Sequence, residues 1–171
     1  MSGHLHELKE FLVRTPFFGG LDDSSLERII GMLVERSFPA GAAVFRAGEQ
    51  GRSMYIVQSG ALVACTSGDS GHTVRLMRFH AGDFFGETTL IEMQPRPFTA
   101  HVEEPAVLYE LTNMDLYRLY QQDVNAYVIV LQNINRELCR RLRAATVRLT
   151  KIADTTGDDV TQIRGTGFRQ R

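Results

Sequence analysis

The sequence contains no tryptophan and only two cysteines among its 171 residues, and no stretch approaches the roughly 20 apolar residues of a membrane-spanning helix. Cys65 and Cys139 do not form a Cys-x-x-Cys pair, so we expect buried free thiols rather than a metal or redox centre. The scattered histidines lack ligand spacing, and no metal site is expected. The first residues carry no basic segment followed by an apolar one, which argues against a secretory signal and favours a cytoplasmic protein.

Neither sign of charge dominates. Nineteen basic and twenty acidic residues give a formal net charge of −1, which excludes a surface that coats nucleic acid or an anionic membrane over its whole area. The basic residues between Arg136 and Lys151 could contact nucleic acid, but a solvated helix face is the favoured interpretation. The sequence also lacks a nucleophile elbow, a P-loop and a supported carboxylate pair, so we expect no enzyme.

The length predicts one domain with additional helices. Residues 1–37 are expected to form N-terminal helices, the second capped by Asp22 or Asp23 and extending to Ser37. Between residues 38 and 111, β-type runs alternate with Gly-rich turns, which is typical of a small β-barrel or jelly roll of about eight strands. Gly60 fits a hairpin turn or a sharp bend. The predicted class is α+β, with a β-roll between N-terminal helices and a long C-terminal helix.

Residues 112–154 are expected to be helical. Thr112 and Asp115 have the spacing of a capping box, and a heptad pattern starts at Val124. Its first turns are expected to pack on the domain, whereas its distal part predicts a homodimer seam, with a polar residue fixing the register. This seam comprises Asn135, Leu138, Leu142, Ala145 and Leu149. Residues 155–171 lack an apolar period and are expected to form a flexible tail.

The segment "GDFFGETTLIEMQPRPFTAHV", residues 82–102, combines groups suited to a nucleotide. Gly86 permits a close backbone approach, and the following residues can form one short helix whose first N–H groups face an anion. Arg96 supplies a planar cation that fits two phosphate oxygens. Glu87 can accept hydrogen bonds from a sugar hydroxyl. An anion, a sugar and an apolar wall together describe a nucleotide.

The chain from about Thr15 to Arg143 resembles the cyclic nucleotide-binding domains of the catabolite activator protein, the regulatory subunit of protein kinase A and cyclic-nucleotide-gated channels. The most specific part is "FGETTLIEMQPR", which keeps the spacing of the family's phosphate-binding cassette, here residues 84–100. The resemblance implies that Gly86 and Glu87 meet the ribose 2′-hydroxyl, that Thr89 and Leu90 offer backbone N–H groups, and that Arg96 binds the cyclic phosphate. The implied ligand-binding residues are Phe85, Gly86, Glu87, Thr88, Thr89, Leu90, Arg96, Pro97, Phe98 and Thr99.

The residue after the arginine departs from the family. Relatives usually have Ala, Ser or Thr there, whose N–H also reaches the phosphate, whereas Pro97 has no N–H. The loss of one hydrogen bond to a charged group predicts an affinity about ten- to a hundredfold lower. The absence of a hydroxyl there favours cAMP over cGMP. Phe98 could line the base pocket or fill the core, the latter being favoured, and Thr99 could face the ligand or belong to the next strand.

In relatives, the helix after the barrel covers the base and moves on binding. The resemblance therefore implies a lid from Tyr127, Ile129 and Val130, and a cAMP (or cGMP) sensor that signals through its C-terminal helix to an unidentified protein, with no other cofactor. Two alternatives stay open. Arg96 could be structural, ion-paired to Glu92 or Glu87 in a ligand-insensitive dimeric module, or the ligand could be another anion such as a cyclic dinucleotide. The output lies in another chain, or this chain is part of a longer protein.

Overall fold

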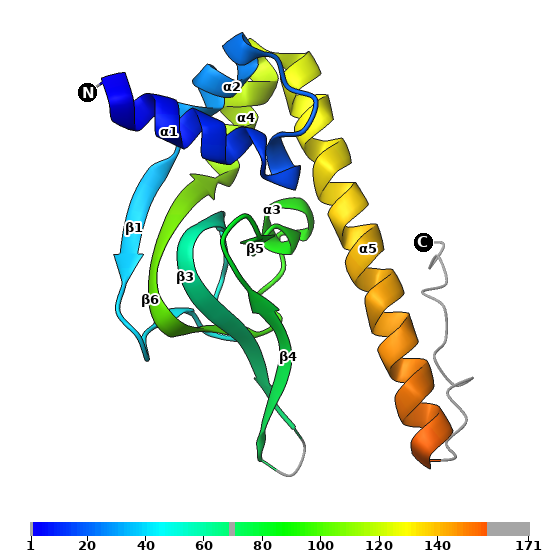
Figure 1. Ribbon diagram of the computed structural model, residues 1–171. Helices are drawn as coiled ribbons and strands as arrows, with labels where there is room; N and C mark the ends of the chain where they lie inside the picture. Colours follow the sequence, from blue (N-terminus) through cyan, green and yellow to red (C-terminus); the bar gives the residue numbers. More distant parts are fainter. Residues whose placement is uncertain (1, 69–70, 157–171) are drawn as a thin grey trace, which may run out of the picture. The chain divides into compact units, whose positions relative to one another are not determined.

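The computed structural model describes residues 2–68 and 71–156, and the chain divides into two units, Met1–Ile134 and Asn135–Arg171 (Figure 1). The predicted tail at residues 157–171 lies outside the described residues. The helices are α1 (Ser2–Val13), the 3-10 helix η1 (Pro16–Phe18), α2 (Asp23–Ile30), α3 (Thr88–Glu92), α4 (Asn113–Gln122) and α5 (Val124–Thr156). The strands are β1 (Val34–Phe38), β2 (Ala43–Phe45), β3 (Ser53–Ser67), β4 (Thr73–Phe79), β5 (Phe84–Phe85) and β6 (Thr99–Thr112).

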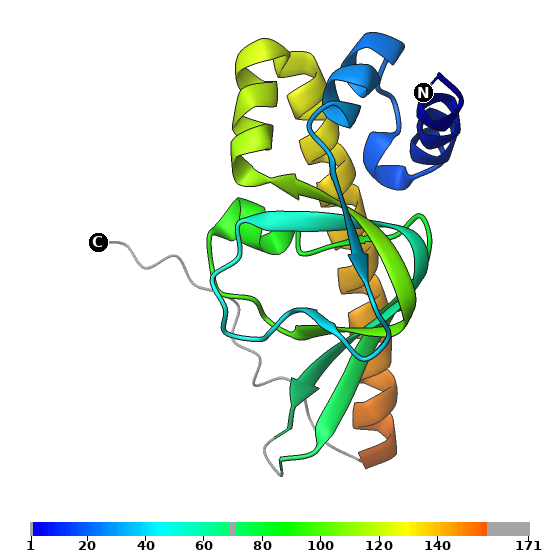
Figure 2. The ribbon, with the colours of Figure 1, turned by 90° about the vertical axis from the view of Figure 1, so that its left-hand side faces the viewer.

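All strand pairs are antiparallel. The order is β1-β6-β3-β4, with β2 on β6 and β5 on β3, and the strands curl into a roll (Figure 2). This confirms the α+β class. Within the described residues there are six strands rather than about eight, and one of the missing ends is at Gly60, where β3 does not end. It bends there instead, with register shifts between Val57 and Ser59 and between Ser59 and Ala61.

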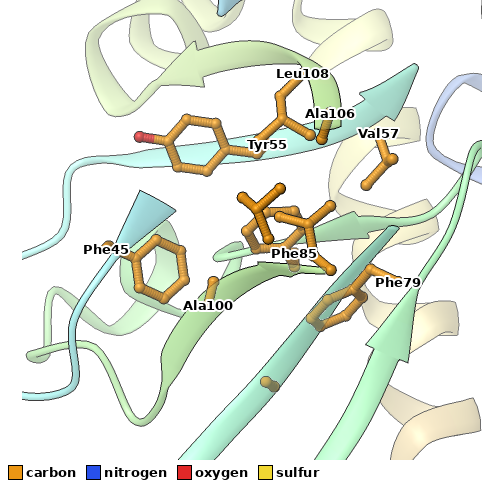
Figure 3. Close-up of a cluster of buried hydrophobic side chains, with 11 residues drawn as sticks. Phe45, Tyr55, Val57, Phe79, Phe85, Ala100, Ala106 and Leu108 are labelled. Carbon is orange, nitrogen blue, oxygen red and sulfur yellow. The ribbon is translucent and has the colours of Figure 1, made fainter. Parts of the chain in front are cut away.

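Aromatic side chains fill the inside of the β-roll (Figure 3). The Phe85 ring stacks on Phe79, with centroids 4.7 Å apart, and on Tyr55 at 5.6 Å, and Phe45 lies 5.8 Å from Phe85. Because side chains alternate along a strand, Tyr55 and Val57 point into this cluster from β3. The other face of β3 is buried as well, so the strand is apolar on both sides.

Helices α1, α2 and α4 gather at one end of the roll (Figure 1). Asp22 caps α2, as predicted, by accepting from the Ser25 N–H at 2.8 Å. The Ser25 hydroxyl donates to Asp123 at 2.7 Å, which ties α2 to the α4–α5 junction. Ring contact between Phe17 and Phe84, 5.4 Å apart, joins η1 to the roll.

The second helix is shorter than predicted. It ends at Ile30 with Gly31 as its C-cap, and residues 34–38 form β1, which pairs with Ala106–Glu110 of β6. The predicted extension of the helix to Ser37 is therefore wrong, and the roll begins at Val34. Pairing with a strand about 70 residues away outweighs the local helical pattern, because alternate residues of β1 gain ladder hydrogen bonds to β6.

The predicted capping box at Thr112 and Asp115 is present and starts α4. Asp123 then interrupts the helix and caps α5, accepting from the Ala126 N–H at 3.0 Å. Within the first unit, Ala126, Val130 and Ile134 are buried. Cys65 is buried as expected, but Cys139 is exposed on α5, so that part of the thiol prediction is wrong.

The heptad positions at the start of α5 face solvent. Val124 is 53% exposed and Val128 is 44% exposed, whereas Val130 is fully buried. At about 100° per residue, Val124 and Val128 lie roughly opposite the buried stripe. The face that packs on the domain is therefore not the predicted seam.

Two further properties concern residues 2–68 and 71–156 alone. None of their helices has the length and hydropathy to cross a membrane. Nor do three or more His, Cys, Asp or Glu side chains in these ranges come together as metal ligands would.

Replacing Tyr109 with phenylalanine is expected to stabilise the fold. The Tyr109 side chain is 3% exposed, and its hydroxyl has no hydrogen-bond partner among the described residues. Burial also raises the pKa of this phenol. Because an unsatisfied buried polar group costs about 1–3 kcal/mol, Tyr109→Phe should raise the free energy of unfolding by about 1 kcal/mol in urea denaturation. The exposed Tyr120→Phe is the control; equal effects of both changes would contradict the prediction.

Candidate functional site

Local backbone geometry brings Arg96 to the inside of the roll. Gly86 follows β5 with φ +82°, a conformation that favours glycine, and leads into α3. Met93, at φ 52°, ends α3 in the left-handed conformation, with its N–H donating to Thr89 O at 3.2 Å. The chain then extends through Pro95 to Arg96, since a residue before proline avoids the helical region.

Pro95 and Pro97 have no backbone N–H, so Arg96 is the only residue of this Pro-Arg-Pro segment that can donate one. The Arg96 N–H donates to Glu49 O at 2.8 Å, and its carbonyl accepts from the Gly48 N–H at 2.9 Å. Pro95 forms an isolated bridge with Gln50. The Pro-Arg-Pro segment therefore runs beside the turn at residues 48–50, and neither proline interrupts these two backbone bonds of Arg96.

The Arg96 guanidinium is buried, with 4% of the residue exposed. Nη1 donates to Gly86 O at 3.1 Å and to Thr89 Oγ1 at 2.9 Å. Nη2 donates to Ser53 O at 2.7 Å and lies 3.5 Å from Ser53 Oγ. All four acceptors are neutral. The charges of Glu49, Glu110 and Glu87 also act on the guanidinium, so the alternative of an Arg96 paired with a protein carboxylate stays open.

Neighbouring groups enclose this cation tightly. Its Cζ lies 4.0 Å from the centroid of the Phe45 ring, in cation–π contact. A Cβ at Gly51 would lie 2.5 Å from Arg96 Nε, and one at Gly86 would lie 2.6 Å from Nη1. Burial lowers the pKa of Arg96, opposed by charges that include Tyr55 and Glu49. A desolvated cation with neutral partners favours pairing with an anion.

The remaining residues of the predicted cassette differ in exposure. Phe85 belongs to the aromatic core, and Glu87 is 2% exposed at the start of α3. Thr89 is buried, with its hydroxyl donating to Gly86 O at 2.9 Å, and Thr88 is half-buried. The Leu90 N–H donates to Glu87 O at 3.0 Å, so in this structure it is not available to a ligand as the resemblance implies.

The three residues after Arg96 differ in their surroundings: one is exposed, one packs on the core and one starts a strand. Pro97 is exposed. The structure places Phe98 against the core, with its ring 5.6 Å from Phe45 and 6.2 Å from Phe79. Thr99 starts β6, and its hydroxyl accepts from the Ala47 N–H at 3.0 Å.

The three predicted lid residues contact the N-terminal segment and α4, or are buried. Val130 is fully buried, and Ile129 Cγ2 lies 3.9 Å from the Cβ that a side chain at Gly20 would carry. The Tyr127 ring meets Tyr120 at 5.4 Å. Asn133 adds hydrogen bonds from Nδ2 to Phe17 O and Gly19 O, at 3.0 and 2.8 Å. Closure of these residues over a ligand stays a prediction.

Sequence reasoning missed most partners of Arg96. Phe45, Gly51 and Ser53 come from segments more than 40 residues earlier in the chain. Only Gly51 gave a signal, as part of a Gly-rich turn, and that signal indicated a turn rather than a site. The side chain of Thr89 was also not assigned to the arginine.

Three comparisons with known proteins agree on one family. Residues 35–123, over half of the chain, match the cyclic nucleotide-binding domain. A cGMP-dependent protein kinase of Eimeria tenella is 30% identical over 152 residues, covering 88% of this chain and 14% of the kinase. The catabolite activator protein of Thermus thermophilus is similar in structure, with a TM-score of 0.72 and 27% identity over 81% of this chain and 63% of that protein.

A third relative is a regulator that responds to a cyclic dinucleotide. The c-di-GMP-responsive global regulator CLP of Xanthomonas campestris has a TM-score of 0.68 and 27% identity, over 77% of this chain and 65% of that one. The chain thus spans about a seventh of the kinase and under two thirds of each regulator. The matched region coincides with the β-roll, the cassette and α4. The chain belongs to the cyclic nucleotide-binding domain family, whose members are regulatory ligand-binding domains.

Proposed function

We propose that this chain is a cyclic nucleotide sensor, that its ligand is cAMP, and that Arg96 holds the cyclic phosphate. The observation that carries the proposal is the buried Arg96 guanidinium, whose four hydrogen-bond acceptors named above are all neutral oxygens. A buried cation gains most from a partner of opposite charge. A cyclic phosphate supplies that charge together with two oxygens for the planar guanidinium.

The neighbourhood of Arg96 also fits the rest of a nucleotide. Glu87 lies at the same corner, where a carboxylate can accept from a ribose hydroxyl. Pro97 offers no N–H to the phosphate, so we expect a weaker affinity than in relatives with alanine or serine there. The missing hydroxyl at this position supports cAMP over cGMP. A cyclic dinucleotide is the second candidate, supported by the similarity to the Xanthomonas regulator.

Titration identifies the ligand. We would titrate cAMP, cGMP and c-di-GMP separately into the purified protein by calorimetry, at the same protein concentration and salt. The proposal predicts saturable binding of cAMP at one site per chain, tighter than that of cGMP. Saturation by c-di-GMP alone would replace the proposed ligand. No heat and no thermal stabilisation with any of the three would favour the ligand-insensitive interaction module.

We further propose that α5 carries the output through a homodimer seam. Val124 and Val128 face away from the domain. In the second unit, Leu142 is 68% exposed and Leu149 is 38% exposed at positions of the same heptad. A narrow apolar stripe of this period is covered best by a second copy of the same helix, with Asn135 fixing the register. The predicted protein partner would then recognise a change in this helix pair.

Replacing Leu142 with aspartate should dissociate the proposed dimer. A charge at the centre of a coiled-coil seam is desolvated without a partner, which should weaken the free energy of dimerisation by about 2 kcal/mol or more. A protein that is dimeric at about 10 μM should therefore become monomeric. Sedimentation velocity measures the change. Val147→Asp is the matched control, because Val147 is 55% exposed on α5 but lies off the heptad stripe. A monomeric wild-type protein would contradict the seam.

A further inference from the structure

A chain of polar groups runs from the Arg96 guanidinium to the edge of the roll. Arg96 Nη2 donates to Ser53 O at 2.7 Å and lies 3.5 Å from Ser53 Oγ. The Ser53 hydroxyl lies 3.2 Å from Tyr55 Oη, which lies 3.3 Å from Glu110 Oε1. Glu110 Oε2 accepts from Arg36 Nε at 2.8 Å. A carboxylate is thus linked to the buried arginine through two hydroxyl groups.

Strand geometry explains why these groups meet. Ser53 and Tyr55 are two residues apart on β3, so their side chains point to the same face. In the ladder between β3 and β6, Tyr55 is directly opposite Glu110. Figure 3 shows the Tyr55 ring within the aromatic core and its hydroxyl at the edge of the cluster. Ser53 and Tyr55 are 7% and 8% exposed, so water competes little for these hydrogen bonds.

From this geometry we infer that Ser53, Tyr55 and Glu110 are positioning residues that hold the Arg96 guanidinium and compete with the ligand's anion for it. The identity of the ligand in this inference rests on the proposed function, whereas the hydrogen-bond chain to Arg96 does not. Both Nη atoms of Arg96, which carry four of its five N–H groups, already contact protein acceptors. A phosphate that binds both Nη atoms must therefore compete with these acceptors.

Glu110 is the negatively charged member of the group that competes with the phosphate for Arg96. Its carboxylate accepts from Tyr55, which polarises the phenol, and the Ser53 hydroxyl next to it faces the guanidinium. Hydrogen-bond chains of this kind strengthen one another. Removing the charge therefore weakens the hold on Arg96 and also removes an anion near the site, and both effects favour a bound phosphate. Glu110→Gln should then tighten cAMP binding, whereas loss of an ordinary structural contact would weaken it or leave it unchanged.

The first test uses no ligand. A double-mutant cycle combines Tyr55→Phe with Arg96→Met and follows urea denaturation. We expect Tyr55→Phe to lower the ratio of folded to unfolded protein about fivefold in the Arg96 protein, the effect of one hydrogen bond. The effect should be smaller in the Arg96→Met protein, where Tyr55 keeps its contact with Glu110 but no longer supports the cation. Equal effects in the two backgrounds would show that Tyr55 is not coupled to Arg96 and would overturn the inference.

The second test measures cAMP affinity in Glu110→Gln and in Glu103→Gln. Glu103 is a matched control, because it lies on the same strand, pairs with Arg75 at 3.0 Å and with Arg78 at 2.9 Å, and has a side-chain exposure of 21% against 17% for Glu110. We expect binding to become about three- to tenfold tighter in Glu110→Gln and to change less than about twofold in Glu103→Gln.

The two tests separate the inference from the proposed function. If Glu110→Gln changes the affinity no more than Glu103→Gln does, the competition is wrong even though cAMP binds. If neither the wild type nor either variant binds cAMP, the proposed ligand is wrong. The double-mutant cycle then still decides whether Tyr55 positions Arg96.

Discussion

Replacing Arg96 with alanine is expected to weaken cAMP binding by at least about a hundredfold, because two hydrogen bonds to a charged group contribute about 3 kcal/mol or more. The guanidinium is the buried cation at the site, and the cyclic phosphate brings the only formal charge of the ligand. Calorimetric titration of the wild type and the variant measures the loss.

Removal of Arg96 also affects the protein without ligand. Ser53 O and Gly86 O lose a donor, and the Phe45 ring loses its cation. The variant must therefore be shown to fold, by circular dichroism at the titration temperature. Arg78→Ala removes the same charge from an exposed side chain that pairs with Glu103, and it should leave the affinity unchanged. A folded Arg96→Ala protein that binds cAMP as the wild type does would refute the role of Arg96.

Replacing Gly60 with alanine is expected to cost about 2–4 kcal/mol of the free energy of unfolding. Gly60 has φ +86°, and a Cβ there would lie 2.4 Å from Pro105 O and 2.7 Å from Ala106 Cα. Both atoms are backbone atoms of β6, which is paired with β3 along most of its length. The neighbours cannot move away without breaking the ladder, so the strain of the left-handed conformation adds to a steric clash.

Gly41→Ala is the matched control for this prediction. Gly41 has nearly the same φ, +84°, but no atom lies within 4 Å of its ideal Cβ. We therefore expect a loss of about 1 kcal/mol, from the backbone conformation alone. Urea denaturation of both variants gives the difference. Equal losses would mean that β6 gives way at Gly60 and that the close approach of the strands is not rigid.

The sequence predicted the fold best where the signal is local. The Asp22 cap, the capping box at Thr112 and the order of helices, roll and long helix are all present, because each depends on residues within one or two turns. The predicted end of the second helix, at Ser37 instead of Ile30, was wrong because the structure of residues 31–38 depends on a distant strand. The apolar residues of this segment continue the helical period of α2, and only pairing with β6 makes them a strand.

The site shows the same division. The positions of Gly86 and Arg96 follow from the spacing of the cassette, which resembles that of the family. The surroundings of the Arg96 guanidinium do not, because Ser53 on β3 contacts it directly and Glu110 on β6 is linked to it only through Tyr55, which the register of the two strands places opposite Glu110. Long-range register depends on the whole sheet. The sequence shows the heptad pattern that starts at Val124, but it does not predict which side of α5 packs on the domain.

The most direct test of the central claim is the ¹H–¹⁵N NMR signal of Arg96 Nε during addition of cAMP, assigned by its loss in Arg96→Lys. If Arg96 holds the cyclic phosphate, this signal must shift and saturate over the same cAMP range as the calorimetric heat. A saturating heat with an unmoved Arg96 signal would show that cAMP binds elsewhere, and would contradict the account.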